Sequence, residues 1–449
     1  MNPRIFREYD IRGIAEEDFS GDDVLLLGKA IGTYLQKHGR SLAAVGRDCR
    51  LTSDAYAGQI IRGLRETGCD VLDIGVCPTP VFYFAIHHFS TGGGIMVTAS
   101  HNPPAYNGFK LCLGLDSIFG REILKIRDMI DSRSFLKGAG ALSPADAVTP
   151  YKSFVKKGVS LSRPLRVAVD AGNGTAGVVA VPILRDLGCE THDLYCDMDG
   201  RFPNHEADPT IPDNLTDLIS LVRGKKLDLG IGYDGDGDRI GVVDETGRII
   251  YGDRLMILFA REILSRKPGA TFVSEVKCSQ VLYDDIRRHG GQAIMWKAGH
   301  SLIKTKMKQE KAELAGEMSG HIFFADRYLG FDDAIYASCR LLELMADFGR
   351  PLSDLLADIP ETFTTPEIRV DCPDDEKFDL VDRVRDDLKA RYHVIDIDGV
   401  RVLFDDGWGL VRASNTQPAL VLRFEALTGQ RLSDIRSLVE GVVEKYKQR

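Results

Sequence analysis

The stretch Gly92-Gly-Gly-Ile-Met-Val-Thr-Ala-Ser-His-Asn-Pro103 is the one around which the chain is organised. Its apolar run, residues 92–97, is typical of a short buried strand, and Asn102-Pro103 indicates a turn. We therefore expect Ser100 on a loop at the end of a strand, where open α/β sheets bind their ligands. A hydroxyl in such a place can act as a nucleophile or carry a transferable phosphoryl group. His101 follows directly, but neighbouring side chains on extended backbone point apart, so the pair does not predict an acyl-hydrolase triad.

Alternating strand and helix patterns flank this stretch, which predicts a parallel sheet. The same rhythm recurs twice further along the chain, although the three units are not close repeats in sequence. After the proline-rich segment 351–375, which we interpret as a connection, the pattern changes to antiparallel strands with two helices, an α+β arrangement. The elements expected in the first unit are strands at 42–45, 71–76 and 95–97 and helices at 22–36, 53–67, 80–88 and 122–132. Those expected in the last unit are strands at 401–404, 409–412 and 419–426 and helices at 378–389 and 432–446.

The expected fold class is α/β, with three α/β domains of mixed or parallel sheets and a smaller α+β domain at the C-terminus. We expect a linker at residues 137–150, where Gly, Ser and Pro gather, and an edge strand or extended arm at residues 5–13. The expected domain limits are 1–148, with the Ser100 loop; 149–252, with an acidic loop; 253–360, with a Glu317 loop; and 361–449, with an Arg412 loop.

Length and charge exclude several classes of protein. A chain of 449 residues is too long for a single hydrophobic core. Its share of apolar residues, 44%, and of charged residues, 27%, is usual for a globular protein. The net charge of −9 argues against a general nucleic-acid binder, which needs a basic face. An anionic small substrate remains compatible with this charge where Arg and Lys converge.

Cysteine usage and the lack of apolar runs indicate a compartment. Nine cysteines are scattered without a Cys-x-x-Cys pair, so free thiols in a reducing cytoplasm are the simplest interpretation. Residues 1–10 are charged and lack the apolar segment of a signal peptide. No stretch of 18 apolar residues occurs, so no membrane span is expected.

Asp234-Gly-Asp-Gly-Asp-Arg239 is the clearest metal-binding pattern. On a flat strand, carboxylates two residues apart lie about 6.6 Å from one another, too far to share a small ion. The intervening glycines allow the backbone to curl, so that Asp234, Asp236 and Asp238 converge. Such oxygen donors suit Mg²⁺ or Ca²⁺, and Arg239 would neutralise a bound phosphate. A solvated acidic turn and an EF-hand are the alternatives; the EF-hand needs Gly where Arg239 stands.

Arg412-Ala-Ser-Asn-Thr416 has the character of a phosphate cradle. On extended backbone Arg412 and Ser414 share a face, and Asn415 and Thr416 add donors at a turn. A fork-shaped guanidinium beside hydroxyl and amide groups suits a dianionic phosphate. A polar hairpin turn is the alternative.

Gly316-Glu-Met-Ser-Gly-His321 is a third polar loop. Glu317 and Ser319 lie two residues apart between glycines, and a carboxylate can accept hydrogen bonds from two neighbouring hydroxyls, as a sugar diol offers. His321 is a candidate proton carrier. A glycine-rich structural loop is the alternative.

Together, the four loops resemble those of the α-D-phosphohexomutase family, and they occur in the family's order from residue 98 to residue 416. Residues 98–103 resemble its phosphoserine loop, 234–239 its metal loop, 316–321 its sugar loop and 412–416 its phosphate loop. Glu317-Met-Ser319 is similar to the bacterial phosphomannomutase/phosphoglucomutase branch, whereas the phosphoglucosamine mutase branch typically has Gln in place of Met318. Residues 6–13 and 106–110 match the former branch as well.

The resemblance implies three α/β domains and a fourth domain around a central cleft, with Mg²⁺ and a hexose 1,6-bisphosphate as activator or intermediate. It implies that Ser100 carries the phosphoryl group and contributes to the metal site with Asp234, Asp236 and Asp238. Positions implied for proton transfer or transition-state stabilisation are Arg12, Lys110, His321 and His101. Positions implied for substrate contact are Tyr9, Lys277, His300, Glu317, Ser319, Arg412, Ser414, Asn415 and Thr416, with Arg239 on the phosphate.

The resulting hypothesis is reversible phosphoryl transfer between O1 and O6 of mannose and glucose phosphates. The alternatives are a phosphoglucosamine mutase, a metal-dependent sugar phosphatase with a phosphoserine intermediate and, with less support, a sugar-phosphate-binding regulator. Sugar phosphates are the expected partners, without nucleic acid or membrane. The number of subunits is left open by the sequence.

Overall fold

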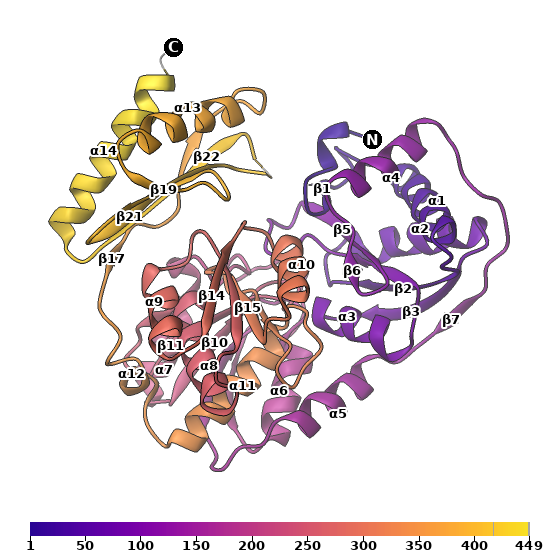
Figure 1. The fold of residues 1–449 in the computed structure, drawn as a ribbon. Coiled ribbons are helices and arrows are strands. Elements are labelled where there is room, and N and C mark those ends of the chain that lie inside the picture. The colour runs from indigo at the N-terminus through magenta and orange to yellow at the C-terminus, as the bar shows by residue number, and fades with distance from the viewer. Residues whose placement is uncertain (416, 448–449) are drawn as a thin grey trace.

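A computed structural model describes residues 1–415 and 417–447. The described chain forms four β-sheets with covering helices, which we call domains I to IV in chain order (Figure 1). In Figure 1, domain I lies at the right, domains II and III lie together at the bottom, and domain IV lies at the upper left. No helix in the described ranges is both long and apolar enough to span a bilayer.

Domain I is a mixed sheet whose strands run in the order β1-β5-β4-β2-β3-β7, with β6 beside β5. Strands β4, β2, β3 and β7 are parallel, whereas β5 pairs antiparallel with both β4 and the edge strand β1. Its strands are β1 (Ile11–Ile14), β2 (Leu42–Arg47), β3 (Asp70–Val76), β4 (Gly93–Val97), β5 (Tyr106–Leu113), β6 (Asp116–Ser117) and β7 (Leu142–Pro144). Its helices are α1 (Gly21–Lys37), α2 (Ser53–Glu66), α3 (Thr79–His88) and α4 (Arg121–Asp131).

Domains II and III repeat the pattern of parallel strands with one antiparallel neighbour. Domain II has the order β12-β11-β10-β8-β9, and domain III the order β14-β13-β15-β16. Domain II contains α5 (Val148–Gly158), β8 (Arg166–Asp170), α6 (Gly177–Asp186), β9 (Glu190–Leu194), α7 (Thr216–Lys225), β10 (Leu229–Tyr233), β11 (Ile240–Asp244) and β12 (Ile249–Ile250). Domain III contains α8 (Gly252–Arg266), β13 (Thr271–Glu275), α9 (Gln280–Arg288), β14 (Gln292–Trp296), α10 (His300–Glu310), β15 (Leu314–Gly316), β16 (Ile322–Phe324) and α11 (Ala334–Phe348), followed by α12 (Leu352–Leu355).

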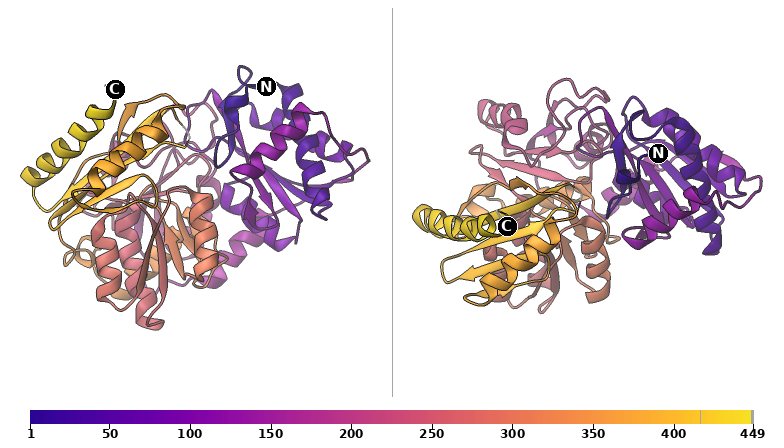
Figure 2. Two further views of the ribbon diagram at one scale, coloured as in Figure 1. Left: turned by 45° about the horizontal axis from the view of Figure 1, so that its top comes forward. Right: turned by 90° about the horizontal axis from the view of Figure 1, so that it is seen from above.

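Domain IV is an antiparallel sheet in the order β17-β22-β21-β20-β19, with β18 also pairing β22. Both of its helices lie on one face of the sheet, as the two views in Figure 2 show. Its elements are β17 (Phe363–Thr364), β18 (Ile368–Asp371), α13 (Lys377–Lys389), β19 (His393–Ile395), β20 (Val400–Phe404), β21 (Gly407–Ala413), β22 (Ala419–Ala426) and α14 (Gly429–Lys447). The α+β arrangement predicted for this part of the chain is confirmed.

The hydrophobic core divides the molecule unequally. One continuous cluster joins α3 of domain I to the sheets and helices of domains II and III, while the other face of the domain I sheet has its own cluster under α1, α2 and α4. Domain IV has a separate core. A small apolar cluster of Val276, Trp408 and Leu410 connects domain IV to domain III. Domains I to III are therefore packed through shared apolar burial, and domain IV is attached more lightly.

Three sequence expectations need correction. The linker expected at residues 137–150 is wrong, because β7 pairs in parallel with β3 and α5 begins at Val148. Proline is tolerated in such a short edge strand, so composition alone misled here. The connection expected at residues 351–375 contains β17 and β18, which belong to the domain IV sheet. Strand β5 was not expected, and it makes the domain I sheet mixed instead of parallel.

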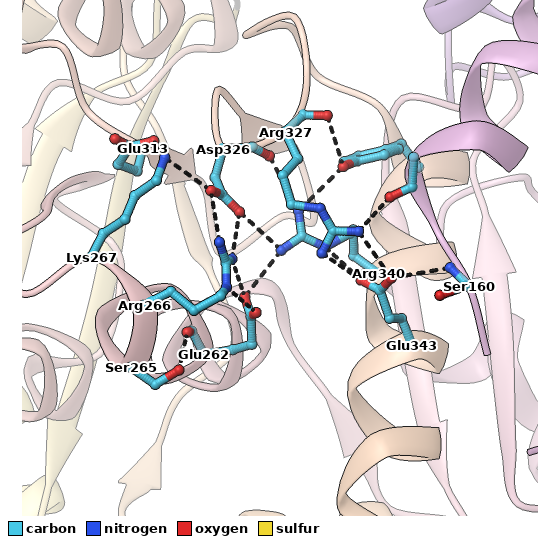
Figure 3. Close-up of polar contacts among 12 residues, drawn as sticks. Ser160, Glu262, Ser265, Arg266, Lys267, Glu313, Asp326, Arg327, Arg340 and Glu343 are labelled. Atoms are coloured by element: carbon cyan, nitrogen blue, oxygen red, sulfur yellow. Dashed lines mark hydrogen bonds and ion pairs between the residues drawn. The ribbon is translucent and has the colours of Figure 1, made fainter. Parts of the chain in front are cut away.

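A buried ionic network ties the end of α8 to α11 and to the end of α5 (Figure 3). The guanidinium of Arg340, which is 3% exposed, pairs with Glu262 at 3.0 Å and Asp326 at 3.1 Å. Burial would raise the pKa of Asp326, but hydrogen bonds from Arg266 and Lys267 and the charge of Arg340 outweigh it and hold the pKa at about 2. The network therefore keeps Asp326 ionised at neutral pH.

Replacing Arg340 tests whether this network stabilises domain III, which contains all of its ionic partners. Arg340→Met should lower the free energy of unfolding by about 3–5 kcal/mol, because it leaves buried carboxylates without their cation. Arg436→Met is the matched control; it removes an exposed pair with Glu440, and such pairs contribute about 0–1 kcal/mol. Denaturant titration of both variants measures the difference. Equal stability of the two variants would contradict the role given to Arg340.

Candidate active site

Ser100 lies on the loop that follows β4, as predicted, and is 3% exposed. Its backbone is left-handed, with φ 50°, which few non-glycine residues adopt. The expectation that Ser100 and His101 point apart is wrong for this reason: it assumed extended backbone, whereas Ser100 Oγ lies 3.2 Å from His101 Nδ1. Burial and the positive charges of Arg239 and Arg12 lower the pKa of His101 well below its ordinary value, so its ring is neutral.

Arg50, on the segment between β2 and α2, fixes the Ser100 loop. Its guanidinium is almost fully buried and is paired with Asp48 at 3.2 Å. The remaining donors reach carbonyl oxygens of the loop: Ser100 at 2.8 Å, Asn102 at 2.6 Å, Pro103 at 2.7 Å and Tyr106 at 3.0 Å. One side chain thus satisfies four backbone acceptors that helices and strands leave unpaired, which stabilises the strained conformation of Ser100.

The acidic loop follows β10 and meets the Ser100 loop directly. Asp234, Asp236 and Asp238 are fully buried, with carboxylate oxygens within 4.8 Å of one another. Ser100 Oγ donates a hydrogen bond of 2.6 Å to Asp234 Oδ2. Gly235 makes this contact feasible, because a Cβ at that position would lie 2.5 Å from the carbonyl oxygen of Ser100. The convergence of three carboxylates predicted from the glycine spacing is present in the structure.

Lys110, from β5, inserts between two of these carboxylates. Its ammonium lies 2.7 Å from Asp236 and also pairs with Asp238. Burial alone would lower the pKa of Lys110, but the charges of Asp236 and Asp238 outweigh it and raise that pKa. Burial and the charges of Asp238 and Asp236 raise the pKa of Asp234 well above its ordinary value. A cation already compensates part of the acidic charge, and more positive charge is favoured there.

These three aspartates fit a hard divalent cation. The Oδ1 atoms of Asp236 and Asp238 are buried without a hydrogen-bond partner among the described residues, and buried acceptors of this kind call for a proton donor or an ion. Asp238, His321 and Asp332 also lie within ligand distance of one another. There, however, Arg239 Nε donates to His321 Nε2 at 2.9 Å, which leaves the ring proton on Nδ1. The described residues also leave Nδ1 of this ring and both oxygens of Asp332 without a hydrogen-bond partner.

His321 instead faces a buried carboxylate. Its Nδ1 lies 3.1 Å from Asp332 Oδ2 and 3.5 Å from Asp238 Oδ1. The ring of His300, at the start of α10, stacks on it with centroids 5.5 Å apart. The backbones of Arg239 and His321 also form an antiparallel bridge. Arg239 ends the acidic loop, and His321 ends the loop at residues 316–321. Nδ1 has no hydrogen-bond partner among the described residues, whereas Nε2 accepts from Arg239 and would have a free lone pair once that guanidinium turns away.

Glu317 and Ser319 follow β15 and lie beside the turn that follows β13. Glu317 is buried and accepts from Gly299 N at 2.6 Å, with Ser319 Oγ at 3.5 Å. Lys277, on the neighbouring turn, pairs with Glu367 of domain IV at 2.6 Å. The charge of Lys277 holds the pKa of Glu367 at about 2. Carboxylates and an ammonium therefore face the same space from domains III and IV.

The Arg412 loop closes this space from domain IV. Arg412 Nε donates to Asp398 at 2.9 Å, and Asn415 Nδ2 donates to the hydroxyl of Tyr9 at 2.6 Å. Tyr9 in turn donates to the carbonyl oxygen of Ala298 at 2.8 Å. The hydroxyl of Ser414 accepts from Gln417 N at 3.1 Å. Thr416, the remaining residue predicted in this loop, lies outside the described residues.

Arg12 completes the set on the domain I side. It lies on β1, donates to Asn102 Oδ1 at 2.6 Å and pairs with Asp10. Two linked groups of side chains result. The first group surrounds the acidic loop and consists of the three aspartates, Ser100, His101, Lys110, Arg239, His300 and His321. Arg12 is tied to the Ser100 loop through Asn102. Tyr9, Lys277, Glu317, Ser319, Arg412 and Asn415 form the second group, and the Tyr9 and His300 rings, 6.4 Å apart, join the two.

Several residues of the site were not found from the sequence. Arg50, Thr79, Asp332, Glu275 and Asp398 each contact a predicted site residue. Thr79, at the start of α3, donates to Asp236 at 2.6 Å. The charged residues Arg47-Asp-Cys-Arg50 after a strand, and the pair Asp332-Asp333 before a helix, were the only local signals available. Both signals also fit ordinary helix caps and surface turns.

Comparison with known proteins agrees with this arrangement. Models of the phosphoglucomutase/phosphomannomutase domains match in order along the chain: alpha/beta/alpha domain I at residues 3–137, domain II at 147–247, domain III at 251–363 and the C-terminal domain at 367–441. Together they span nearly all of the described chain, which confirms the resemblance found in the four loops.

Individual relatives are similar over almost their full length. A phosphomannomutase/phosphoglucomutase of Pseudomonas aeruginosa is 44% identical over 435 residues, 97% of this chain and 94% of the relative. A phosphoglucomutase of Neisseria meningitidis serogroup A is 42% identical over 445 residues, 98% and 96% of the two chains. A crystal structure of a phosphoglucomutase/phosphomannomutase family protein from Burkholderia thailandensis superposes with a TM-score of 0.94 at 42% identity, covering 100% of this chain and 98% of that one. The chain therefore belongs to the phosphoglucomutase/phosphomannomutase family and is an enzyme of the mutase class, an isomerase.

Proposed function

We propose that the protein moves a phosphoryl group reversibly between O1 and O6 of glucose and mannose phosphates, through phosphorylated Ser100 and a hexose 1,6-bisphosphate. The observation that carries this proposal is the hydrogen bond of 2.6 Å from Ser100 Oγ to Asp234, in a buried site that also holds Asp236, Asp238 and Lys110. A hydroxyl placed among carboxylates and cations is suited to carry a phosphoryl group whose charge must be neutralised.

Mg²⁺ is the proposed metal, held by Asp234, Asp236 and Asp238 together with an oxygen of phosphorylated Ser100. When bound, it would neutralise charge on the transferring phosphoryl group. Lys110 and Arg239 add positive charge at the same place, and Arg12 borders the loop. We assign Lys110 to electrostatic stabilisation, because the raised pKa keeps its ammonium protonated at neutral pH.

His321 is the side chain that we propose as general base. Its Nδ1 lies 3.1 Å from Asp332 Oδ2, so the charge of that carboxylate would stabilise the ring when Nε2 accepts the proton of the sugar hydroxyl. Arg239 occupies Nε2 in the present structure. A phosphate that attracts the Arg239 guanidinium would free this nitrogen, so substrate binding and exposure of the base would be linked.

The second group of side chains is proposed to hold the substrate. Glu317 and Ser319 would bind neighbouring sugar hydroxyls, and Lys277, Arg412, Ser414, Asn415 and Thr416 would bind the phosphate that is not reacting. Tyr9 and His300 would line the path between the two groups. For the reaction to be completed, the bisphosphate turns over so that its other phosphate meets Ser100. The same side chains bind the substrate in both orientations. They must therefore recognise a phosphate and two neighbouring hydroxyls without distinguishing the O1 phosphate from the O6 phosphate.

The alternatives share the first half of this reaction. A phosphatase would let water attack the phosphoserine and would not need the Glu317 and Arg412 loops to hold and reorient a sugar. The nine cysteines are all unpaired within the described structure, which supports a reducing compartment, and we propose the cytoplasm. A phosphoglucosamine mutase would use the same loops with another sugar.

A coupled assay separates these functions. Glucose 1-phosphate and mannose 1-phosphate should both be converted to their 6-phosphates, with efficiencies within about tenfold of each other, since each tenfold corresponds to about 1.4 kcal/mol and the sugars differ only at C2. Chelation of divalent cations should abolish the conversion. Free phosphate is measured in parallel. Phosphate release at the rate of sugar conversion would indicate a phosphatase, and a strong preference for glucosamine 1-phosphate would indicate the other mutase branch.

Removing the Ser100 hydroxyl tests the covalent step. Ser100→Ala should lose at least about 1,000-fold in kcat, a loss of the size that groups acting directly in the transition state produce, while its melting temperature stays close to that of the wild type. Intact-mass measurement should find a phosphate, a gain of one phosphoryl group, on the wild-type chain after incubation with glucose 1,6-bisphosphate. The variant should gain none at this position. Normal turnover by Ser100→Ala would refute the phosphoserine mechanism.

Shortening Arg412 tests the proposed phosphate clamp. Hydrogen bonds to charged groups contribute about 1.5–3 kcal/mol each, so Arg412→Ala should raise KM for glucose 1-phosphate and mannose 1-phosphate by about 10- to 100-fold. It should also release more bisphosphate per turnover, and added bisphosphate should partly restore the rate. Arg436→Ala, on an exposed face of the same domain, is the control. Unchanged KM values for both sugars would leave the Arg412 loop without a role in binding.

A further inference from the structure

The turn that carries Lys277, residues 276–280, is bound from two directions. Two of its amides donate within domain III: Val276 N donates to Trp296 O at 3.0 Å and Cys278 N to Glu275 O at 3.0 Å. Its carbonyls do not follow this pattern. The turn lies at the carboxyl end of β13 and leads into α9, which begins at Gln280.

Two arginines of domain IV bind these carbonyls. Arg401 Nη1, from β20, donates to Val276 O at 2.6 Å and to Cys278 O at 2.8 Å. Arg423 Nη1, from β22, donates to Lys277 O at 2.8 Å. Three consecutive carbonyl oxygens of domain III are therefore satisfied by the guanidinium groups of another domain. Buried carbonyls must be paired, so the turn depends on domain IV for its conformation.

Arg401 is built into domain IV as a rigid donor. It is fully buried, and its guanidinium lies 3.8 Å from the centre of the Trp408 ring and 5.8 Å from that of Tyr283. Stacking on two rings fixes the plane of the guanidinium, which restricts where its donors can point. Trp408 Nε1 donates to Glu425, which is itself buried.

Glu425 extends the same contact to the start of α9. It accepts from Ser279 Oγ at 2.6 Å and from Gln280 N at 3.1 Å. Ser279 is the N-cap of this helix, and its hydroxyl accepts from Val281 N. A carboxylate at a helix N-terminus is favourable, because it satisfies free amides there. Every residue of the turn from 276 to 280 thus has at least one hydrogen bond to domain IV.

We propose that Arg401 is a positioning residue for the transfer reaction, which fixes Lys277 relative to the phosphate loop of domain IV. The inference rests on the proposed function, in which Lys277 and Arg412 bind the same substrate. Strand β20 pairs with β21, with Arg401 opposite Leu410, two residues before Arg412. Arg401 and the paired strands β20 and β21 therefore connect the Lys277 turn to Arg412. We infer that this connection keeps the Lys277 ammonium at a constant distance from the Arg412 guanidinium, even if domain IV rotates.

Arg401→Lys should break this link while Lys277 and Arg412 themselves stay unchanged. The single ammonium of a lysine cannot hold two carbonyls in a fixed fork or stack flat on Trp408. The Lys277 turn should then loosen, although Lys277 itself is unchanged. Arg401→Lys should raise KM for glucose 1-phosphate about tenfold and change kcat less than threefold, because binding is affected more than the chemistry at Ser100.

A double-mutant cycle distinguishes positioning from general stability. The four proteins are the wild type, Arg401→Lys, Lys277→Met and the double variant. If Arg401 acts through Lys277, the double variant should have the KM of Lys277→Met within about twofold. Arg431→Lys is the matched control, since this arginine of the same domain also stacks on a ring, Phe404 at 5.0 Å, and pairs with Asp406. It should leave KM unchanged.

The outcomes decide the inference in each case. Multiplicative effects of the two substitutions on KM, or an unchanged KM in Arg401→Lys, would overturn it. If Arg401→Lys lowers the melting temperature so far that kinetics are unusable, Arg423→Lys replaces it in the cycle, because it removes only the donor to Lys277 O. Absence of sugar isomerisation by the wild type would refute the proposed function. The cycle is then run on the Kd for glucose 1-phosphate by calorimetry, where additivity still overturns the positioning role.

Discussion

The hydrogen bond between Ser100 and Asp234 is the interaction on which the arrangement of the site depends. It joins loops that follow strands of two different sheets, and it forms only because both loops approach backbone to backbone. Gly235 leaves room for the carbonyl oxygen of Ser100, and the left-handed backbone of Ser100 turns its hydroxyl toward the acidic loop. Arg50 holds that conformation by occupying four carbonyls of the loop. The left-handed backbone of Ser100, the absence of a side chain at Gly235 and the buried guanidinium of Arg50 together place the Ser100 hydroxyl among carboxylates.

Charge balance follows from this placement. Burying three aspartates is costly without cations, and the cations available are Lys110, Arg239 and, across the loop, Arg12. With a divalent cation bound, the positive charges of the metal, Lys110 and Arg239 would exceed the negative charge of the three aspartates. A dianionic phosphate would neutralise this excess. The charge balance also divides the roles of the side chains. Lys110 is held as an ammonium by Asp236 and Asp238, whereas His321 has Nδ1 3.1 Å from Asp332 and Nε2 bound by Arg239.

The sequence predicted where the chemistry lies better than how its parts are held. Ser100, the three aspartates, Lys277 and Glu317 could each be placed at the end of a strand, because apolar runs ending in Gly and polar residues carry that information locally. Strand β5 could not be predicted from Tyr106–Leu113, whose mixed pattern acquires meaning only beside β1 and β4. The conformation of Ser100 was wrongly expected, because its backbone depends on Arg50, fifty residues earlier. Arg401, buried against Trp408, resembles any surface arginine in the sequence.

The unequal division of the core explains why domain IV needs polar docking. Domains I to III share apolar burial, so their loops keep a fixed geometry around Ser100. Domain IV meets them through Val276, Trp408 and Leu410 and through hydrogen bonds to the turn that carries Lys277. In the proposed mechanism, a large apolar interface would fix the Arg412 loop against the other domains and hinder the bisphosphate, which has to turn over. Hydrogen bonds from Arg401 and Arg423 attach domain IV at the Lys277 turn, and single hydrogen bonds attach its Arg412 loop and Asp398 to Tyr9 and Ala298. In the proposed function, domain IV must release and regain the substrate phosphate. It is attached through the turn that carries Lys277, which is itself proposed to bind that substrate.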